Sequence, residues 1–124
     1  MIYLIGGVPC SGKSTLMRNL ISRLEEPKDV EPMPLFKCQQ HGDILVCGRY
    51  PKGETFGGTD RLSNGAIPHF REFVDGANVG WKHTIKEGDR FLRAEDIERV
   101  LDTHESEVYI LTVNSDEELS LIHI

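Results

Sequence analysis

The sequence predicts an α/β fold with a mostly parallel sheet and flanking helices, because two kinds of segment alternate along it. Short apolar runs, at Met1 to Gly6 and Val108 to Val113, are typical of strands buried on both faces. Between them, apolar residues recur at helical spacing, first in the stretch from Ser14 to Leu24. Strands that alternate with helices join into a parallel sheet through right-handed crossovers.

The N-terminal third is predicted as a strand, a helix and then irregular chain. The helix begins at Ser14, and its apolar side consists of Leu16, Met17, Leu20, Ile21 and Leu24. Pro27 is expected to end it, because proline lacks an amide donor and clashes within a helix. Pro32 and Pro34 then predict no regular structure before Leu35.

Two strands around His41-Gly42 are predicted to form a hairpin, from Leu35 to Gln40 and from Asp43 to Tyr50. This turn would set three facing pairs: Gln40 with Asp43, Cys38 with Leu45, and Phe36 with Cys47. The two cysteines are therefore expected to fill the core separately rather than as cross-strand partners.

The alternation continues after a glycine-containing loop at Pro51 to Gly58. A helix that ends at Asp75-Gly76 is marked by its apolar stripe, Ile67, Phe70, Phe73 and Val74. A strand is predicted from His83 to Glu87, and the last helix is marked by Ile97, Val100 and Leu101. The run from Val108 to Val113 is the final buried strand of this pattern.

Composition excludes several classes of protein. A chain of 124 residues is shorter than one domain of about 150 residues, so a single domain is expected. The net charge of −6 argues against a strongly basic nucleic-acid coat protein. No apolar run approaches about eighteen residues, so no membrane span is expected. Three cysteines without metal-ligand spacing, and no secretory signal at Met1 to Ile5, indicate the reducing cytoplasm.

A phosphate-binding loop is the strongest motif in the sequence. The pattern G-x-x-x-x-G-K-[ST] is matched at every fixed position by Gly7, Val8, Pro9, Cys10, Ser11, Gly12, Lys13 and Ser14, and Thr15 follows. A predicted strand precedes the motif and an amphipathic helix follows it, as this loop requires. The glycines allow successive N–H groups to converge on an anion, and the helix start adds partial positive charge. The sequence therefore predicts a nucleoside triphosphate, such as ATP, in this loop.

Within the loop, Lys13 is expected to reach the outer phosphates, and the Ser14 hydroxyl is suited to bind Mg²⁺. Cys10 is either a reactive thiol near a helix start or only a small side chain.

Two Asp-Arg pairs are candidates for the acceptor side of a phosphotransferase. Asp60-Arg61 lies in the loop after the hairpin, and Asp89-Arg90 follows the predicted strand that ends at Glu87. Carboxylates orient an acceptor hydroxyl or hold metal, and arginines neutralise the transferred phosphoryl group. In α/β sheets such residues act at the carboxyl ends of strands. The alternative is that both pairs are solvated surface dipeptides.

Together, the loop at Gly7 to Thr15, the segment from Gly48 to Ser63 and the segment from Glu87 to Phe91 resemble the P-loop nucleotide-kinase-like proteins of tailed phages. That group includes kinases that phosphorylate hydroxymethyluracil within phage DNA, and the resemblance spans most of Met1 to Asn114. It implies a P-loop NTPase-type fold and a kinase dependent on ATP and Mg²⁺, in the cytoplasm of a bacterial or phage-infected cell. In such kinases a basic lid follows the strand matched here by Val108 to Val113.

The resemblance implies a substrate or metal role for Asp60, Arg61, Glu87, Asp89 and Arg90. We expect Glu87 to act with Ser14 on the metal side, through water to Mg²⁺. Asp60 is the candidate for orienting or deprotonating the acceptor hydroxyl, and Asp89 is the alternative for either acid. Both arginines would bind phosphate or acceptor. Arg49 and Tyr50 either line the acceptor pocket or only end a strand.

The last six residues, Leu119 to Ile124, resemble the conceptual translation of a transposase mosaic-end adapter used in sequencing libraries. We interpret residues 119–124 as adapter read-through, and residues 1–118 as a partial kinase-like domain whose natural gene continues. The alternative is an ordinary apolar C-terminal strand.

The favoured function is ATP-dependent transfer of phosphate to a hydroxyl of a nucleotide, or of a hydroxymethyl pyrimidine in DNA. A P-loop NTPase without an acceptor, and a non-catalytic nucleotide-binding fragment, are the alternatives. The sequence does not distinguish a free nucleotide from a DNA base as the acceptor, and it does not indicate an oligomeric state.

Overall fold

The computed structural model describes residues 1–7, 12–48, 50, 65–76, 81–88, 94–113 and 119–123. Over these residues the chain forms three helices: α1 (Lys13–Ile21), α2 (Ala66–Asp75) and α3 (Ala94–Thr103). Its strands are β1 (Ile2–Gly7), β2 (Lys28–Met33), β3 (Phe36–His41), β4 (Ile44–Cys47), β5 (His83–Glu87), β6 (Ser106–Val113) and β7 (Leu119–His123). This mixture of helices and strands confirms the α/β class.

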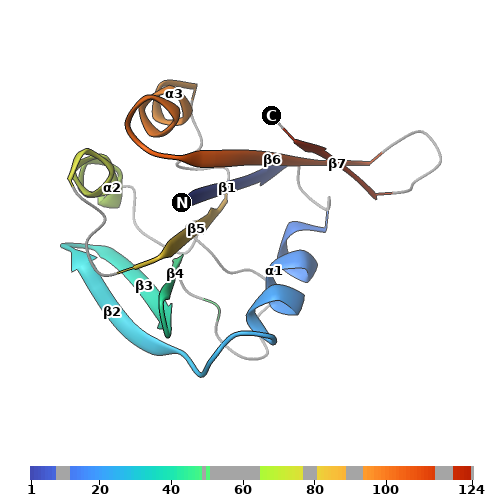
Figure 1. Cartoon of the computed structure of the whole chain (residues 1–124), viewed down its shortest axis with the longest axis horizontal. Coiled ribbons are helices and arrows are strands. Elements are labelled where there is room, and N and C mark those ends of the chain that lie inside the picture. The colour runs from blue at the N-terminus through green and yellow to red at the C-terminus, as the bar shows by residue number, and fades with distance from the viewer. Residues whose placement is uncertain are drawn as a thin grey trace.

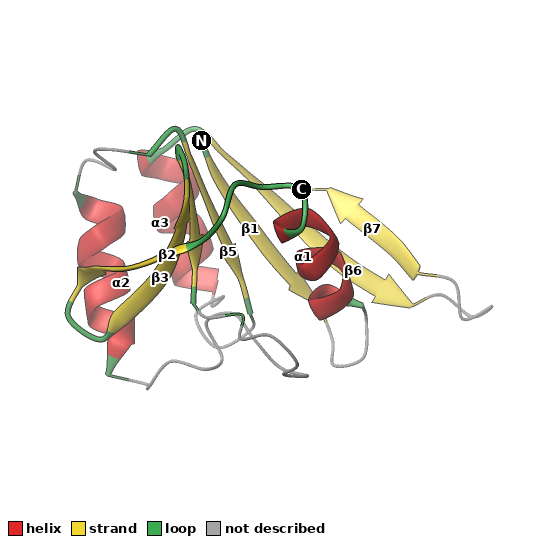
Figure 2. Cartoon of the chain, turned by 90° about the horizontal axis from the view of Figure 1, so that it is seen from below, coloured by secondary structure: helices red, strands yellow, loops and turns green. Residues whose placement is uncertain are grey.

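The strands form one mixed sheet in the order β2-β3-β4-β5-β1-β6-β7. The four central strands, β4, β5, β1 and β6, are parallel to one another, as the alternating pattern predicts. The flanking pairs β2–β3, β3–β4 and β6–β7 are antiparallel. Because the central strands share one direction, their carboxyl ends meet at a single edge of the sheet (Figure 2).

The two faces of the sheet are covered by different helices, with α2 and α3 on one side and α1 on the other (Figure 1). The larger core lies under α2 and α3 and includes Leu4, Phe36 and Phe70. The smaller core lies under α1 and is built around Met17, with Ile5 and Ile85 from the central strands. Alternate residues of β1 therefore serve opposite faces, which explains why this strand is apolar along its length.

The segment before Leu35 is regular, contrary to the expectation from its prolines. Residues Lys28–Met33 form the edge strand β2, which pairs with β3 and has an irregular register between Val30 and Met33. Pro32 falls in that irregularity, where the ladder does not need its missing amide donor. The first helix ends at Ile21, before Pro27. It is followed by a tighter turn, in which the amides of Arg23 and Leu24 donate to the carbonyls of Leu20 and Ile21.

The predicted hairpin exists, but its register is wrong by two residues. His41 pairs with Ile44, so the turn residues are Gly42 and Asp43. Gly42 has a φ of 59° in the first turn position, where two-residue hairpin turns require positive φ and favour glycine. In the turn that the sequence predicts, His41-Gly42, this glycine is the second residue.

As a consequence, Cys38 and Cys47 are direct cross-strand partners, which corrects the expectation that they are separate. Both thiols are free and buried, so the expectation that they fill the core is confirmed. Burial, reinforced by the hydrogen bond to Cys38, raises the pKa of the Cys47 thiol well above its ordinary value.

Residues Leu119–His123 form β7 and pair in register with β6, from Val113 opposite Leu119 to Tyr109 opposite His123. These residues therefore form a strand. The interpretation of residues 119–124 as adapter read-through stays a prediction. No helix in the described part of the chain has the length and apolar character needed to span a membrane.

Candidate functional site

The junction between β1 and α1 places the two fixed ends of the glycine-lysine motif together. β1 ends at Gly7, whose φ is 150°, and α1 starts after Gly12, which adopts the left-handed conformation with a φ of 92°. Residues other than glycine rarely adopt either of these φ values, so the backbone conformation requires glycine at both positions. The Lys13 ammonium donates a hydrogen bond to the carbonyl oxygen of Gly7. This bond brings the lysine back across the loop to the strand that precedes it.

The start of α1 suits an anion. Its first turn contains no acidic residue, and its N-cap, Gly12, offers no side-chain hydrogen bond to the first amides. The partial positive charge of this helix end is therefore not offset by a carboxylate of the helix itself. Phosphate and carboxylate groups bind at helix starts of this kind.

A buried carboxylate lies beside the same strand. Glu87, the last residue of β5, is 3% exposed and is the register partner of Ile5, two residues before Gly7. The next amide, of Gly88, donates a hydrogen bond of 3.2 Å to the carbonyl of Ile5. The end of β5 is thus fixed next to the end of β1.

Tyr50 contacts this carboxylate. Its hydroxyl donates a hydrogen bond of 2.8 Å to Oε2 of Glu87. The bond joins the chain just after β4 to the end of the neighbouring strand β5. The structure therefore assigns Tyr50 to the carboxyl edge of the sheet, and its side chain orients Glu87.

Lys86 is a further residue of this edge, and no sequence motif predicts it. It is 1% exposed, and its ammonium lies 4.9 Å from the centre of the Phe70 ring on the α2 side of the sheet. Lysine is almost never fully buried without a compensating interaction. Because Lys86 stands within a predicted buried strand, neither spacing nor a motif distinguishes it from its neighbours.

The remaining predicted site residues lie outside the described part of the chain. They are Val8, Pro9, Cys10 and Ser11 of the loop, Arg49, and the two pairs Asp60-Arg61 and Asp89-Arg90. Ser14 is placed in the first turn of α1, but its hydroxyl is outside the description. Of the predicted residues, the structure gathers Gly7, Gly12, Lys13 and Glu87 at one edge of the sheet, with Tyr50.

Among the described residues, no group of three or more histidine, cysteine, aspartate or glutamate side chains could hold a metal ion. Mg²⁺ in phosphate-transfer sites is held chiefly by the nucleotide, with one or two protein oxygens and water. Glu87, which lies next to the end of β1, carries a carboxylate of the kind that can serve as such an oxygen ligand.

Comparison with known proteins identified no relative. No family model matches the sequence, and neither the curated proteins nor the solved structures contain a match.

Proposed function

We propose that this chain is a P-loop phosphotransferase that moves the γ-phosphoryl group of ATP to a hydroxyl group. The acceptor hydroxyl would belong to a nucleotide or to a hydroxymethyl pyrimidine in DNA, as in the phage nucleotide-kinase-like proteins that the sequence resembles. One observation carries the proposal most directly. A motif of the Walker type connects a central parallel strand to a helix, with Lys13 held across the loop at Gly7.

The nucleotide phosphates would bind over the start of α1. The backbone amides after Gly12 and the Lys13 ammonium supply the positive charge that the outer phosphates require. Exchange of the Gly7 carbonyl for phosphate oxygens would give this lysine a stronger, charge-assisted partner.

The Glu87 carboxylate would act on the metal side. Mg²⁺ supplies neutralisation of the β- and γ-phosphate oxygens, and its protein contacts would be the Ser14 hydroxyl and, through water, Glu87. Tyr50 holds one oxygen of Glu87 at 2.8 Å, so the carboxylate has a fixed orientation toward this edge.

In the transfer step, the acceptor oxygen bonds to the γ-phosphorus as the bond from that phosphorus to the bridging oxygen breaks. Asp60 would accept the hydroxyl proton, and ADP leaves with the bridging oxygen. Arg61 and Arg90 would neutralise the transferring group, with Asp89 as the alternative acid. These assignments rest on the sequence, since all four residues lie outside the described part of the chain.

Transfer of labelled γ-phosphate tests the proposal. The chain is incubated with labelled Mg·ATP and either mononucleotides or DNA that contains hydroxymethyluracil, with unmodified DNA as the control. Label on one acceptor class supports a kinase and names its substrate. Release of free phosphate alone would identify an NTPase, and binding without turnover would identify a nucleotide-binding fragment. EDTA should abolish transfer, and turnover that survives EDTA would exclude the metal side of the site.

A further inference from the structure

A cavity of about 260 Å³ lies between α1 and the sheet. Leu20 of α1 forms its helix side, and side chains of β1, β4, β5 and β6 form its sheet side. Among the described helices, α1 alone lies on this face (Figure 1). A helix is about 10 Å across and neighbouring strands lie about 4.8 Å apart, so one helix cannot cover a sheet of seven strands. Helix α1 therefore leaves part of this face open, and the cavity lies beside it.

The cavity is distinct from the phosphate-binding loop. Tyr3 and Ile5 stand four and two residues before Gly7, and Leu20 stands seven residues after Lys13. From the rise per residue of strands and helices, Tyr3 is about 13 Å from Gly7 along β1, and Leu20 is about 10 Å from Lys13 along α1. The cavity thus lies toward the amino ends of the central strands, away from the candidate nucleotide site.

The cavity walls are apolar and aromatic. Ile5, Ile44 and Ile85 supply aliphatic surface from three neighbouring strands. The rings of Tyr3 and His83 lie together on the same wall, with centroids 5.7 Å apart and planes tilted by 54°. None of the described residues that line the cavity is a lysine, arginine, aspartate or glutamate. A charged ligand would lose its hydration here without gaining an opposite charge, so the walls favour an uncharged aromatic ligand.

One nitrogen of a wall residue lacks a partner. Nδ1 of His83 is buried and makes no hydrogen bond within the described part of the chain. With its proton on Nε2, the imidazole offers Nδ1 as an acceptor. A buried water needs about two to four polar partners, and the Tyr109 hydroxyl of this cavity already donates to Oε2 of Glu107 at 2.6 Å. A ligand with one N–H or O–H group would satisfy the nitrogen and fill the apolar space as well.

The volume of the cavity sets the size of this ligand. A dry apolar cavity of about 150 Å³ is large enough for benzene, whereas pockets for drug-sized ligands begin near about 300 Å³. A volume of about 260 Å³ lies between these limits and suits one ring or two fused rings.

We propose that this cavity is a binding site for a small, uncharged aromatic molecule whose single N–H or O–H group donates to Nδ1 of His83. The site goes beyond the proposed phosphotransferase reaction, because none of its residues has a part in that reaction. Its tests therefore give the same answer whether or not the chain transfers phosphate.

Indole is the probe, and indene, which has the same fused rings without the N–H group, is its control. By NMR titration, we expect indole to bind with a Kd of about 1 mM or tighter. His83→Phe keeps a ring beside Tyr3 and removes the acceptor, so the ratio of indole affinity to indene affinity should fall about fivefold. An unchanged ratio would overturn the proposal.

Isoleucine methyl NMR locates the bound probe. Ile5, Ile44 and Ile85 line the cavity, whereas Ile67 and Ile97 belong to the core under α2 and α3. Indole should shift the methyl resonances of the first three residues only. Shifts confined to the other core, or no shift at millimolar indole, would overturn the site. Shifts of the cavity methyls that grow with protein concentration, in the absence of indole, would assign the cavity to a second copy of the chain and overturn the small ligand.

Two variants of α1 and a competition complete the test. Leu20→Phe adds volume at the cavity wall, and Leu16→Phe makes the same change at a position that is 37% exposed and does not line the cavity. Leu20→Phe should weaken indole binding about tenfold, and Leu16→Phe should leave it within about twofold. Equal indole affinity in the two variants, with both folded by circular dichroism, would overturn the proposal. Excess Mg·ATP should not displace indole, and displacement would place indole in the nucleotide site instead.

Discussion

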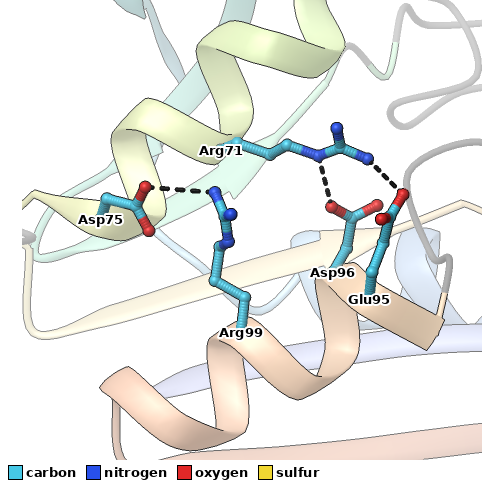
Figure 3. Close-up of polar contacts among 5 residues, drawn as sticks. All are labelled: Arg71, Asp75, Glu95, Asp96 and Arg99. Carbon is cyan, nitrogen blue, oxygen red and sulfur yellow. Dashed lines mark hydrogen bonds and ion pairs between the residues drawn. The ribbon is translucent and has the colours of Figure 1, made fainter.

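Two helices start at the same edge of the sheet with opposite electrostatic arrangements. Helix α1 follows a left-handed glycine, has no acidic residue in its first turn, and carries Lys13 at its first position. Helix α3 has Glu95 and Asp96 in its first turn, and Arg71 of α2 neutralises both (Figure 3). Both starts carry the same partial positive charge from their peptide dipoles. At the start of α3, carboxylates of the chain itself meet this charge, whereas the start of α1 suits an external anion.

The prediction with the largest expected effect tests whether the chain catalyses phosphoryl transfer from a nucleotide at the start of α1. On the proposed function, Asp60→Asn should lower kcat by about 10²–10⁴-fold, because it removes the proposed general base, with Mg·ATP affinity nearly unchanged. Glu87→Gln should weaken both turnover and the Mg²⁺-dependent part of binding. Steady-state kinetics and calorimetry on both variants check these outcomes. If Asp60→Asn retains normal kcat while Asp89→Asn abolishes it, Asp89 is the acceptor-side acid.

The second prediction concerns Lys13, the cation of the α1 start. Lys13→Ala removes the charge-assisted contact proposed for the outer phosphates, which would contribute about 1.5–3 kcal/mol, and should weaken ATP binding by roughly tenfold or more. Arg18→Ala is the matched control, because Arg18 is an exposed basic residue in the last turn of the same helix. Calorimetry measures both. Normal ATP affinity in a folded Lys13→Ala variant would exclude this loop as the nucleotide site.

The third prediction addresses the start of α3. Asp96→Asn removes the buried charge opposite Arg71 and should lower the free energy of unfolding by about 1–3 kcal/mol. Glu95→Gln acts on a carboxylate that is 66% exposed, so about 0–1 kcal/mol is expected. Urea unfolding of both variants gives the two values. Equal losses would show that burial does not distinguish the two acids.

The sequence was sufficient for the parts of the fold that depend on local pattern. The strand His83–Glu87 is confirmed at both ends, and the apolar stripe of α2 is buried as expected. The cysteine pair shows where pattern fails. A register change of two residues keeps every side chain on the same face of the strand, so alternation alone cannot distinguish the predicted from the observed pairing. In the observed register, Gly42 is the first of the two turn residues and has a positive φ.

The site shows the same division. The loop motif has a fixed spacing, so Gly7, Gly12 and Lys13 could be identified from the sequence, and the structure brings them together. The bond from Tyr50 to Glu87 joins residues 37 positions apart, and it depends on β4 lying beside β5. The burial of Lys86 and the contact of Arg71 with Glu95 and Asp96 likewise arise from packing between elements and carry no sequence motif.

The last prediction has the smallest expected effect. It concerns a substitution that places an acidic residue in the first turn of α1, as in α3. Thr15, exposed in the first turn of α1, is replaced by Glu, with Thr15→Gln as the uncharged control. A carboxylate at a helix start favours the helix by about 0.3–1 kcal/mol, and the same charge should repel an incoming phosphate by a comparable amount. ATP binding by Thr15→Glu should therefore be about twofold to fivefold weaker than by Thr15→Gln. Because both charges are close to solvent, this difference should shrink as the salt concentration rises. Equal ATP affinity for the two variants at low salt would mean that nucleotide does not bind at this helix start.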